Sequence, residues 1–479
     1  MFFAKTRIRG VRVSSMVVLL ALMLVLIDIK SIAVVTRTKP TGDSAKEVYL
    51  QQGFRDKQQQ TAVRYRQDFT YDRRKWDETG PTRIALLAST HKAASTTIQV
   101  FFSSLTSITV PMRPDNTVLG PHDRDRRPDP SITDWVWPVG ADSEVPYVEQ
   151  ADWKAHAPFA DFITEGWRHP FFKNHENFEE SRGEIAGFYR TLLRRPWEEG
   201  KKLVIGAETF DTIAAGLLTD PVENDRGEET HVSPNADATI DNLLDVLPWG
   251  EVSNNSSNSS SSGDTSNNGT VSVKPLELGD IELHIHHRTP RVGHLISLWH
   301  EMGIGKPITL RNFILQNQLH FFRINSLAVA HQYARRGFKV TIVDMEGVAR
   351  ANRTLQEVAA CEVVKLGDGK LCDGDGHLRI PGYQLPAGNL VRNRKRDGSG
   401  RGLTDGQMKA IDRVLDMYDC RVWQHLRKYQ KRGNLRVLYP SDDLFATCDP
   451  GGSRDISYRD TVRRIAEIAA GARASPGRR

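Results

Sequence analysis

Residues 84–102 read IALLASTHKAASTTIQVFF, and this stretch decides the fold. Its first five residues are apolar, and a run of that length is typical of a strand that is buried on both faces. Small and hydroxyl-bearing residues follow, and an amphipathic pattern that predicts a helix begins near Thr96. A buried strand, a short loop and a helix in this order are typical of an α/β protein with a parallel sheet.

The same succession recurs along the chain. Four more apolar runs predict strands, at 203–207 (LVIGA), 281–285 (IELHI), 339–344 (KVTIVD) and 435–439 (LRVLY). Helical patterns cover 236–247, 291–302, 325–336 and 404–430. We therefore predict an α/β fold in which a central parallel sheet of about five strands is flanked by helices.

Composition narrows the class of protein. The 479 residues are 39% apolar, which excludes a disordered or fibrous chain. The formal charge of +6 is mild for this length, so we predict no nucleic-acid partner. Four cysteines exclude a disulfide scaffold but allow one or two bridges. Cys361 and Cys372 flank a Gly/Asp turn and are consistent with one pair, which would leave Cys420 and Cys448 as the second, but the sequence does not determine the connectivity.

The amino-terminal segment predicts that the protein is located in the secretory pathway. Residues 1–15 carry basic side chains and no acidic one, and residues 16–27 are uninterrupted and apolar. We expect a cytoplasmic tail at 1–15 and a signal-anchor transmembrane helix at 16–35. A cleaved signal peptide is the alternative, because twelve apolar residues also fit its hydrophobic region. Both place the rest of the chain in the lumen.

Four further segments follow from composition. A polar stem is expected at 36–80, one large α/β domain at 81–450, and a C-terminal helix and tail at 451–479. The domain carries a disordered Ser/Asn-rich insertion at 251–275.

Glycosylation sequons occur at Asn254, Asn255, Asn258, Asn268 and Asn352, which favours a glycoprotein. Residues 111–200 are predicted to form a long excursion whose tryptophans, Trp135, Trp137, Trp153 and Trp167, offer stacking surfaces for sugar rings, with packing in the core as the alternative.

A phosphate-binding loop is predicted after the first strand, in His91-Lys92-Ala93-Ala94-Ser95-Thr96-Thr97. Ligands of parallel α/β sheets bind beyond the carboxyl ends of the strands. Small residues let backbone amides approach an anion, and the helix start adds positive potential. Lys92 supplies a cation, and the hydroxyls of residues 95–97 supply donors. The loop is not a Walker A sequence, because the G-x-x-x-x-G-K-[ST] spacing is absent.

Two further strand ends carry candidate site residues. Arg288 follows the third predicted strand and Ser297 lies on the next helix, an arrangement that predicts an anion clamp. Glu208 lies just beyond the second strand, where a carboxylate is a candidate general base, with Asp211 three residues further. A structural ion pair or a helix cap is the alternative role for Glu208. The rival bases are His91, His286 and His287.

These segments resemble the PAPS-dependent sulfotransferases, especially the Golgi membrane carbohydrate sulfotransferases; PAPS is 3′-phosphoadenosine 5′-phosphosulfate. The family loop, roughly P-K-x-G-[ST]-[ST], is similar to residues 91–96, with Lys92, Ser95 and Thr96 in the family positions. The family segment R-x-P-x(5)-S is similar to Arg288-Thr289-Pro290 followed by Ser297. Two departures stand out. Ala94 replaces the family glycine, and the arginine-to-serine spacing is nine instead of the usual eight, which leaves Arg288 and Arg291 as alternatives.

The resemblance implies transfer of a sulfuryl group from PAPS to a hydroxyl or amine of a carbohydrate in the Golgi lumen. The product would be 3′,5′-adenosine bisphosphate, no metal would be needed, and Lys92 would neutralise the leaving oxygen. The nucleotide would be held by residues 91–97 together with Arg288 and Ser297. The acceptor and the oligomeric state stay open, as does secretion after signal cleavage.

Two other functions remain as alternatives. A lumenal glycosyltransferase that uses a nucleotide sugar would need an Asp-x-Asp pair, for which Asp123/Asp125 and Asp373/Asp375 are candidates. A non-catalytic nucleotide-binding relative would share the phosphate loop. The basic segment 391–404 is expected to be a solvated loop, with closure over a phosphate or an acidic substrate as the alternative.

Overall fold

The computed structural model describes Trp76, Thr90, Ser233, Cys448 and the ranges 81–88, 93–111, 133–141, 156–164, 178–214, 235–247, 276–302, 309–316, 324–366, 371–380, 403–441 and 456–471. All of them belong to one compact unit, residues 62–479. The expected cytoplasmic tail, anchor and insertion lie outside the described residues, and so does the stem except Trp76. No helix among the described residues has the length and apolar character needed to cross a bilayer.

The core is a parallel β-sheet with the strand order β2-β3-β4-β1-β5-β6-β7. The five strands predicted from sequence are all present, as β1 (Ile84–Leu87), β4 (Lys202–Gly206), β5 (Ile281–His287), β6 (Lys339–Asp344) and β7 (Leu435–Leu438). Their residues are almost entirely buried, as expected for a sheet with helices on both faces.

Two strands at one side of the sheet were not expected from sequence. Six strands form a continuous ladder that includes β3 (Trp135–Ala141), and β2 (Ser107–Pro111) pairs only with β3. Strand β3 pairs with β4 through Trp135 and Val136 and with β2 from Trp137 onwards. The prediction of a simple excursion over 111–200 is therefore wrong, because this stretch supplies an integral strand. Pro138 and Gly140 within β3 concealed the strand pattern.

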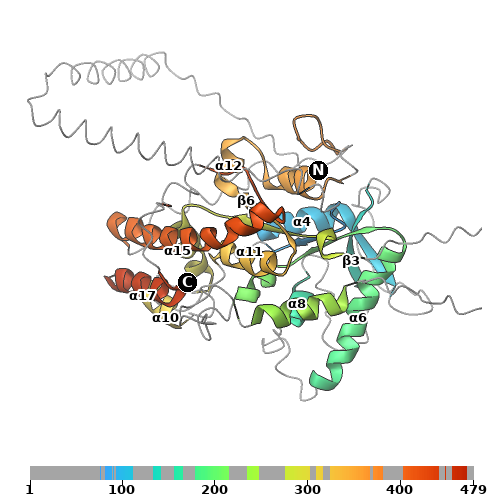
Figure 1. Ribbon diagram of the computed structural model, residues 1–479, viewed down its shortest axis with the longest axis horizontal. Coiled ribbons are helices and arrows are strands. Elements are labelled where there is room, and N and C mark those ends of the chain that lie inside the picture. Colours follow the sequence, from blue (N-terminus) through green and yellow to red (C-terminus); the bar gives the residue numbers. More distant parts are fainter. Residues whose placement is uncertain are drawn as a thin grey trace, which may run out of the picture. The chain divides into compact units, whose positions relative to one another are not determined.

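Helices cover both faces of the sheet (Figure 1). On one face α4 (Ser95–Thr106) packs against alternate residues of β1, such as Ala85 and Leu87. On the other face lie α5 (Ala157–Ile163), α6 (Phe178–Glu198), α8 (Asn235–Val246), α9 (Arg291–Met302), α11 (Ser326–Arg335) and α15 (Asp405–Arg432). The alternation of apolar residues along each strand thus separates two cores, one on each side of the sheet.

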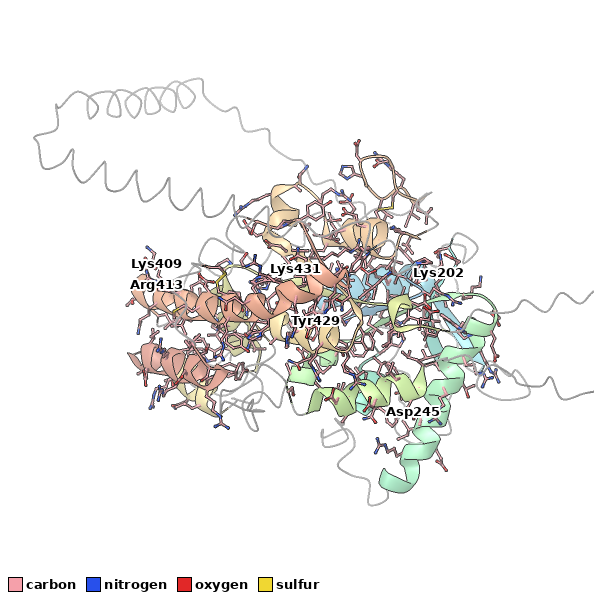
Figure 2. All side chains as sticks on the ribbon, in the orientation of Figure 1. Lys202, Asp245, Lys409, Arg413, Tyr429 and Lys431 are labelled. Carbon is pink, nitrogen blue, oxygen red and sulfur yellow. A yellow bond between two sulfur atoms is a disulfide. The ribbon has the colours of Figure 1, made fainter. Side chains whose placement is uncertain are left out.

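Shorter elements complete the domain. They are the 3-10 helices η5 (Glu208–Ala214), η6 (Leu278–Asp280) and η10 (Ala469–Gly471), the α-helices α10 (Leu310–Gln316), α12 (Met345–Arg350), α13 (Leu355–Glu357) and α17 (Tyr458–Ile468), and the π-helix η8 (Val358–Val363). Figure 2 shows Lys409 and Arg413 near the start of α15 and Lys431 near its end, so this long helix carries exposed charge at both ends. Asp245, at the end of α8, pairs with Arg190 of α6 at 2.5 Å (Figure 2).

Both expected disulfide pairs have bonding geometry. Cys361 of η8 is bonded to Cys372, eleven residues on, and Cys420 of α15 is bonded to Cys448. Each disulfide bond links a helix to a segment that belongs to no named helix or strand. Such bonds persist in oxidising compartments.

Candidate active site

The candidate site lies where β4, β1 and β5 end side by side. Leu87 of β1 is paired with Gly206 of β4 and with His284 of β5, so these three strands end at one edge of the sheet. The segments that follow them carry Ser95, Glu208 and Arg288. This edge is where α/β sheets bind ligands.

The predicted phosphate loop turns sharply into α4. The Ala93 amide donates to the Thr90 carbonyl at 3.1 Å, and the Thr97 amide donates to the Ala94 carbonyl at 3.1 Å. Ala94 has φ 60°, a left-handed conformation that glycine adopts at least cost. Position 94, where the motif that the loop resembles has glycine, therefore has a backbone conformation that favours glycine. His91, Lys92 and the Thr96 side chain lie outside the described residues.

Ser95 and Glu208 are in direct contact. The Ser95 hydroxyl, in the first turn of α4, donates a hydrogen bond to the Glu208 carboxylate at the start of η5. Residues 113 positions apart in sequence are thus brought together by the pairing of β1 with β4. A carboxylate at this point can accept a proton from a group bound next to the loop. Asp211, the neighbouring acid, is fully buried.

Arg288 and Ser297 also form the predicted pair. The Arg288 guanidinium donates to the Ser297 hydroxyl at 3.2 Å, although nine residues separate them. Both side chains are only partly buried, so their polar atoms lie at a surface where an anion can bind. An arginine and a hydroxyl at one position provide several donors for phosphate oxygens.

Arg291, the alternative to Arg288, is part of the core. Its side chain is 1% exposed, and its Nε lies 2.7 Å from Asp419 Oδ2 of α15. Its Nη2 donates to Asn325 Oδ1 at 3.2 Å. Burial raises the pKa of Asp419 to about 6, although Arg291 acts in the opposite direction. Arg291 is therefore a structural residue that anchors α9 to α15, which leaves Arg288 as the candidate anion ligand.

The rival histidine bases among the described residues are buried. His287 Nδ1 is hydrogen-bonded to Ser326 Oγ at 2.8 Å, on the face of the sheet that α11 covers. His286 Nδ1 lies 2.7 Å from the Ala93 carbonyl oxygen, beneath the phosphate loop. Burial lowers the pKa of His286 to about 4, and lowers that of His287 well below its usual range. Both rings are buried and each has its Nδ1 in a contact within the protein, so Glu208 remains the candidate base among the described residues.

The remaining candidate residues have structural roles in the described part of the chain. Trp135 and Trp137 are 1% and 0% exposed and pack in the core beneath α4, so neither can stack on a sugar; Trp153 and Trp167 lie outside the described residues. Asp373 is held in a turn, where it accepts from the His377 amide at 2.8 Å and pairs with Arg379 at 3.0 Å, so Asp373/Asp375 does not form an open metal pair at a strand end. Asp123/Asp125 and residues 391–402 lie outside the described residues. No group of potential metal ligands occurs in the described part of the chain.

A separate groove of about 430 Å³ lies between α10 and α17. Three arginines and apolar side chains line it, together with an acid: Arg311, Arg459, Arg463, Leu315, Val462, Ala466 and Glu467. Arg463 is paired with Asp460 at 2.7 Å, and Glu467 shares the groove. Acidic side chains therefore offset part of the positive charge of this groove.

Comparison of the chain with family models, with curated proteins and with solved structures finds no match. The sequence predicts Ser95, Glu208, Arg288 and Ser297 as site residues but does not predict the contact of His286 with the loop. The only sequence signal for this contact is that His286 stands two residues before Arg288, because residues two apart in an extended chain lie on the same side.

Proposed function

We propose that the chain is a sulfotransferase that uses PAPS to sulfate a carbohydrate in the secretory lumen. One observation carries the proposal: the Ser95–Glu208 contact and the Arg288–Ser297 contact both involve segments that follow the neighbouring strands β4, β1 and β5. A hydroxyl donor at a helix start and an arginine–serine clamp suit the two phosphate ends of PAPS. The carboxylate beside them suits the acceptor.

The reaction that fits this arrangement is an in-line displacement at sulfur. The acceptor oxygen attacks the sulfuryl sulfur and forms the new O–S bond, while the bond from sulfur to the 5′-phosphate oxygen breaks. Glu208 takes the proton of the acceptor hydroxyl. 3′,5′-Adenosine bisphosphate leaves with its 3′-phosphate on Arg288 and Ser297, and Lys92 is assigned to the charge that develops on the leaving oxygen.

A lumenal location is part of the proposal. Two disulfide bonds favour an oxidising compartment, and the apolar segment 16–35 supplies the signal anchor. Asn352, in the sequon 352–354, is exposed and can carry a glycan. A shift in apparent mass on glycosidase treatment of the chain made in eukaryotic cells tests this placement.

The direct test combines binding with turnover. Purified full-length chain should bind 3′,5′-adenosine bisphosphate in calorimetry and transfer labelled sulfate from PAPS to a panel of polysaccharides. Failure to bind the bisphosphate would overturn the proposal. Binding without transfer to any glycan would favour a non-catalytic relative. Manganese-dependent binding of a nucleotide sugar would favour the glycosyltransferase.

A further inference from the structure

His286 occupies an unusual position for a buried histidine. Strand β5 alternates, so that Ile281, Leu283 and Ile285 join the core on the side of α8 and α11. Glu282, His284 and His286 occupy the other face, beside α4. Glu282 is neutralised by Arg436 at 2.8 Å, whereas His286 reaches out of the sheet to the loop after β1.

The contact with the loop determines which ring nitrogen carries the hydrogen. A carbonyl oxygen can only accept, so the 2.7 Å contact requires His286 Nδ1 to donate to the Ala93 oxygen. The ring stays neutral near pH 7, because burial lowers its pKa to about 4 against the smaller effect of the Ala93 bond. The donor at Nδ1 is therefore permanent under physiological conditions.

This bond orients a whole peptide group. The Ala93 carbonyl and the Ala94 amide belong to one planar trans peptide, in which C=O and N–H point in opposite directions. With the carbonyl directed into the core at His286, the Ala94 N–H points away from the core. Ala94 has φ 60°, a conformation that costs about 1 kcal/mol or more for a residue with a Cβ atom, so the loop needs such a restraint.

We propose that His286 is a positioning residue that orients the Ala93–Ala94 peptide so that the Ala94 amide faces the 5′-phosphosulfate of the nucleotide. The inference rests on the proposed function. It links the two ends of the nucleotide site, because Arg288, the clamp for the 3′-phosphate, follows His286 by two residues. One strand end thus sets both the loop and the clamp.

The test separates the two ends of the ligand. His286→Leu keeps the branched shape but removes the donor, and His286→Asn keeps a donor at the δ position. We expect His286→Leu to weaken binding of 3′,5′-adenosine bisphosphate about tenfold. Binding of adenosine 3′-monophosphate, which lacks the 5′-phosphate, should change by less than about twofold. His286→Asn should restore most of the affinity for the bisphosphate.

His284→Leu is the matched control, because His284 is equally buried on the same face of β5 and its ring lies 4.8 Å from that of His286. It should leave both affinities unchanged. Equal weakening of both ligands by His286→Leu would show mere structural damage and overturn the inference, as would unchanged binding of the bisphosphate. Wild-type chain that binds neither ligand would overturn the proposed function itself, and the inference with it.

A measurement on the unmodified chain guards against a variant that fails to fold. Nitrogen-15 labelling of histidine in the full chain reports the tautomer of each neutral ring. The inference requires hydrogen on Nδ1 of His286, and hydrogen on Nε2 would overturn it.

Discussion

Ser95 and Glu208 are hydrogen-bonded across the ends of β1 and β4, so the predicted phosphate loop and the candidate base share one contact. On the proposed function, a serine hydroxyl that turned to a phosphate oxygen would release the carboxylate to an acceptor hydroxyl. We therefore expect the nucleotide to bind before the acceptor is deprotonated.

Glu208→Gln should separate chemistry from binding. The amide keeps the size and a contact with Ser95 but cannot take the acceptor proton, so kcat should fall by about a hundredfold or more. The Kd for 3′,5′-adenosine bisphosphate should change by less than about threefold. Single-turnover sulfate transfer and calorimetry measure the two quantities. A variant with near-normal kcat would remove Glu208 from the mechanism.

Arg288 and Arg291 should differ sharply when mutated. Arg288→Ala removes charge-assisted bonds to the 3′-phosphate and should weaken nucleotide binding by about tenfold to a hundredfold with little change in Tm. Arg291→Met leaves Asp419 buried without its cation and should destabilise the fold by about 3 kcal/mol or more. Calorimetric titration and thermal unfolding distinguish them.

The control for the arginine pair is Arg194→Ala, because Arg194 is an exposed residue of α6 that pairs with Glu198 of the same helix at 2.7 Å. It should affect neither quantity. A loss of nucleotide binding in a well-folded Arg291→Met variant, with Arg288→Ala unaffected, would reverse the assignment of the two arginines.

Ala94→Gly should relieve the left-handed backbone. Removing Cβ at φ 60° is expected to stabilise the folded chain by about 0.5–1 kcal/mol, after the entropy that glycine adds to the unfolded chain. Ala94→Val should be destabilising, because a β-branched side chain is worse still in this region. Chemical denaturation measures both, and a less stable glycine variant would contradict the prediction.

Acidification should destabilise the domain between about pH 6.5 and 4. Burial lowers the pKa of His156 and His286 to about 4. The unfolded chain therefore binds more protons in this window, and stability falls as the pH drops, by up to about 1.4 kcal/mol per pH unit for each ring. The pKa values of His284 and His287 are lowered too, which adds to the loss.

Asp419 opposes this trend, because burial raises its pKa to about 6 and the folded state then binds the extra proton. Burial raises the pKa of Asp344 and Asp412 as well, so three acids oppose the four histidines. The histidines ordinarily titrate near pH 6.5, above the ordinary range of the acids, so the loss of stability dominates as the pH first falls below 7. Tm measured from pH 7 to pH 5 checks the direction. In His156→Gln the slope of Tm against pH should be smaller, by about the contribution of one histidine. A Tm that rises on acidification would be inconsistent with four neutral buried rings.

Loss of the Cys420–Cys448 bridge should destabilise the chain. The bond closes 28 residues, and opening such a loop costs about 3–4 kcal/mol in unfolded-state entropy. The Cys361–Cys372 loop of eleven residues should cost somewhat less. Paired cysteine-to-serine variants compared by thermal unfolding measure this order, and peptide mapping without reductant should recover these two pairs and no crossed ones.

The sequence alone determined the local architecture. Apolar runs such as 84–88 and 281–285 form strands, and the amphipathic segment at 404–430 forms α15. These elements could be predicted because an apolar run or a helical period is visible within a short stretch of sequence. The pattern failed at β3, where Pro138 and Gly140 interrupt a strand that only its neighbours stabilise.

Tertiary structure alone decided which polar residues meet. Arg288 and Arg291 look alike in sequence, and only the packing of α9 on α15 buries one of them against Asp419. The contacts of Ser95 with Glu208 and of His286 with Ala93 likewise depend on strand order. Residues distant along the chain become neighbours through the shared burial of the sheet, and no local pattern records that pairing.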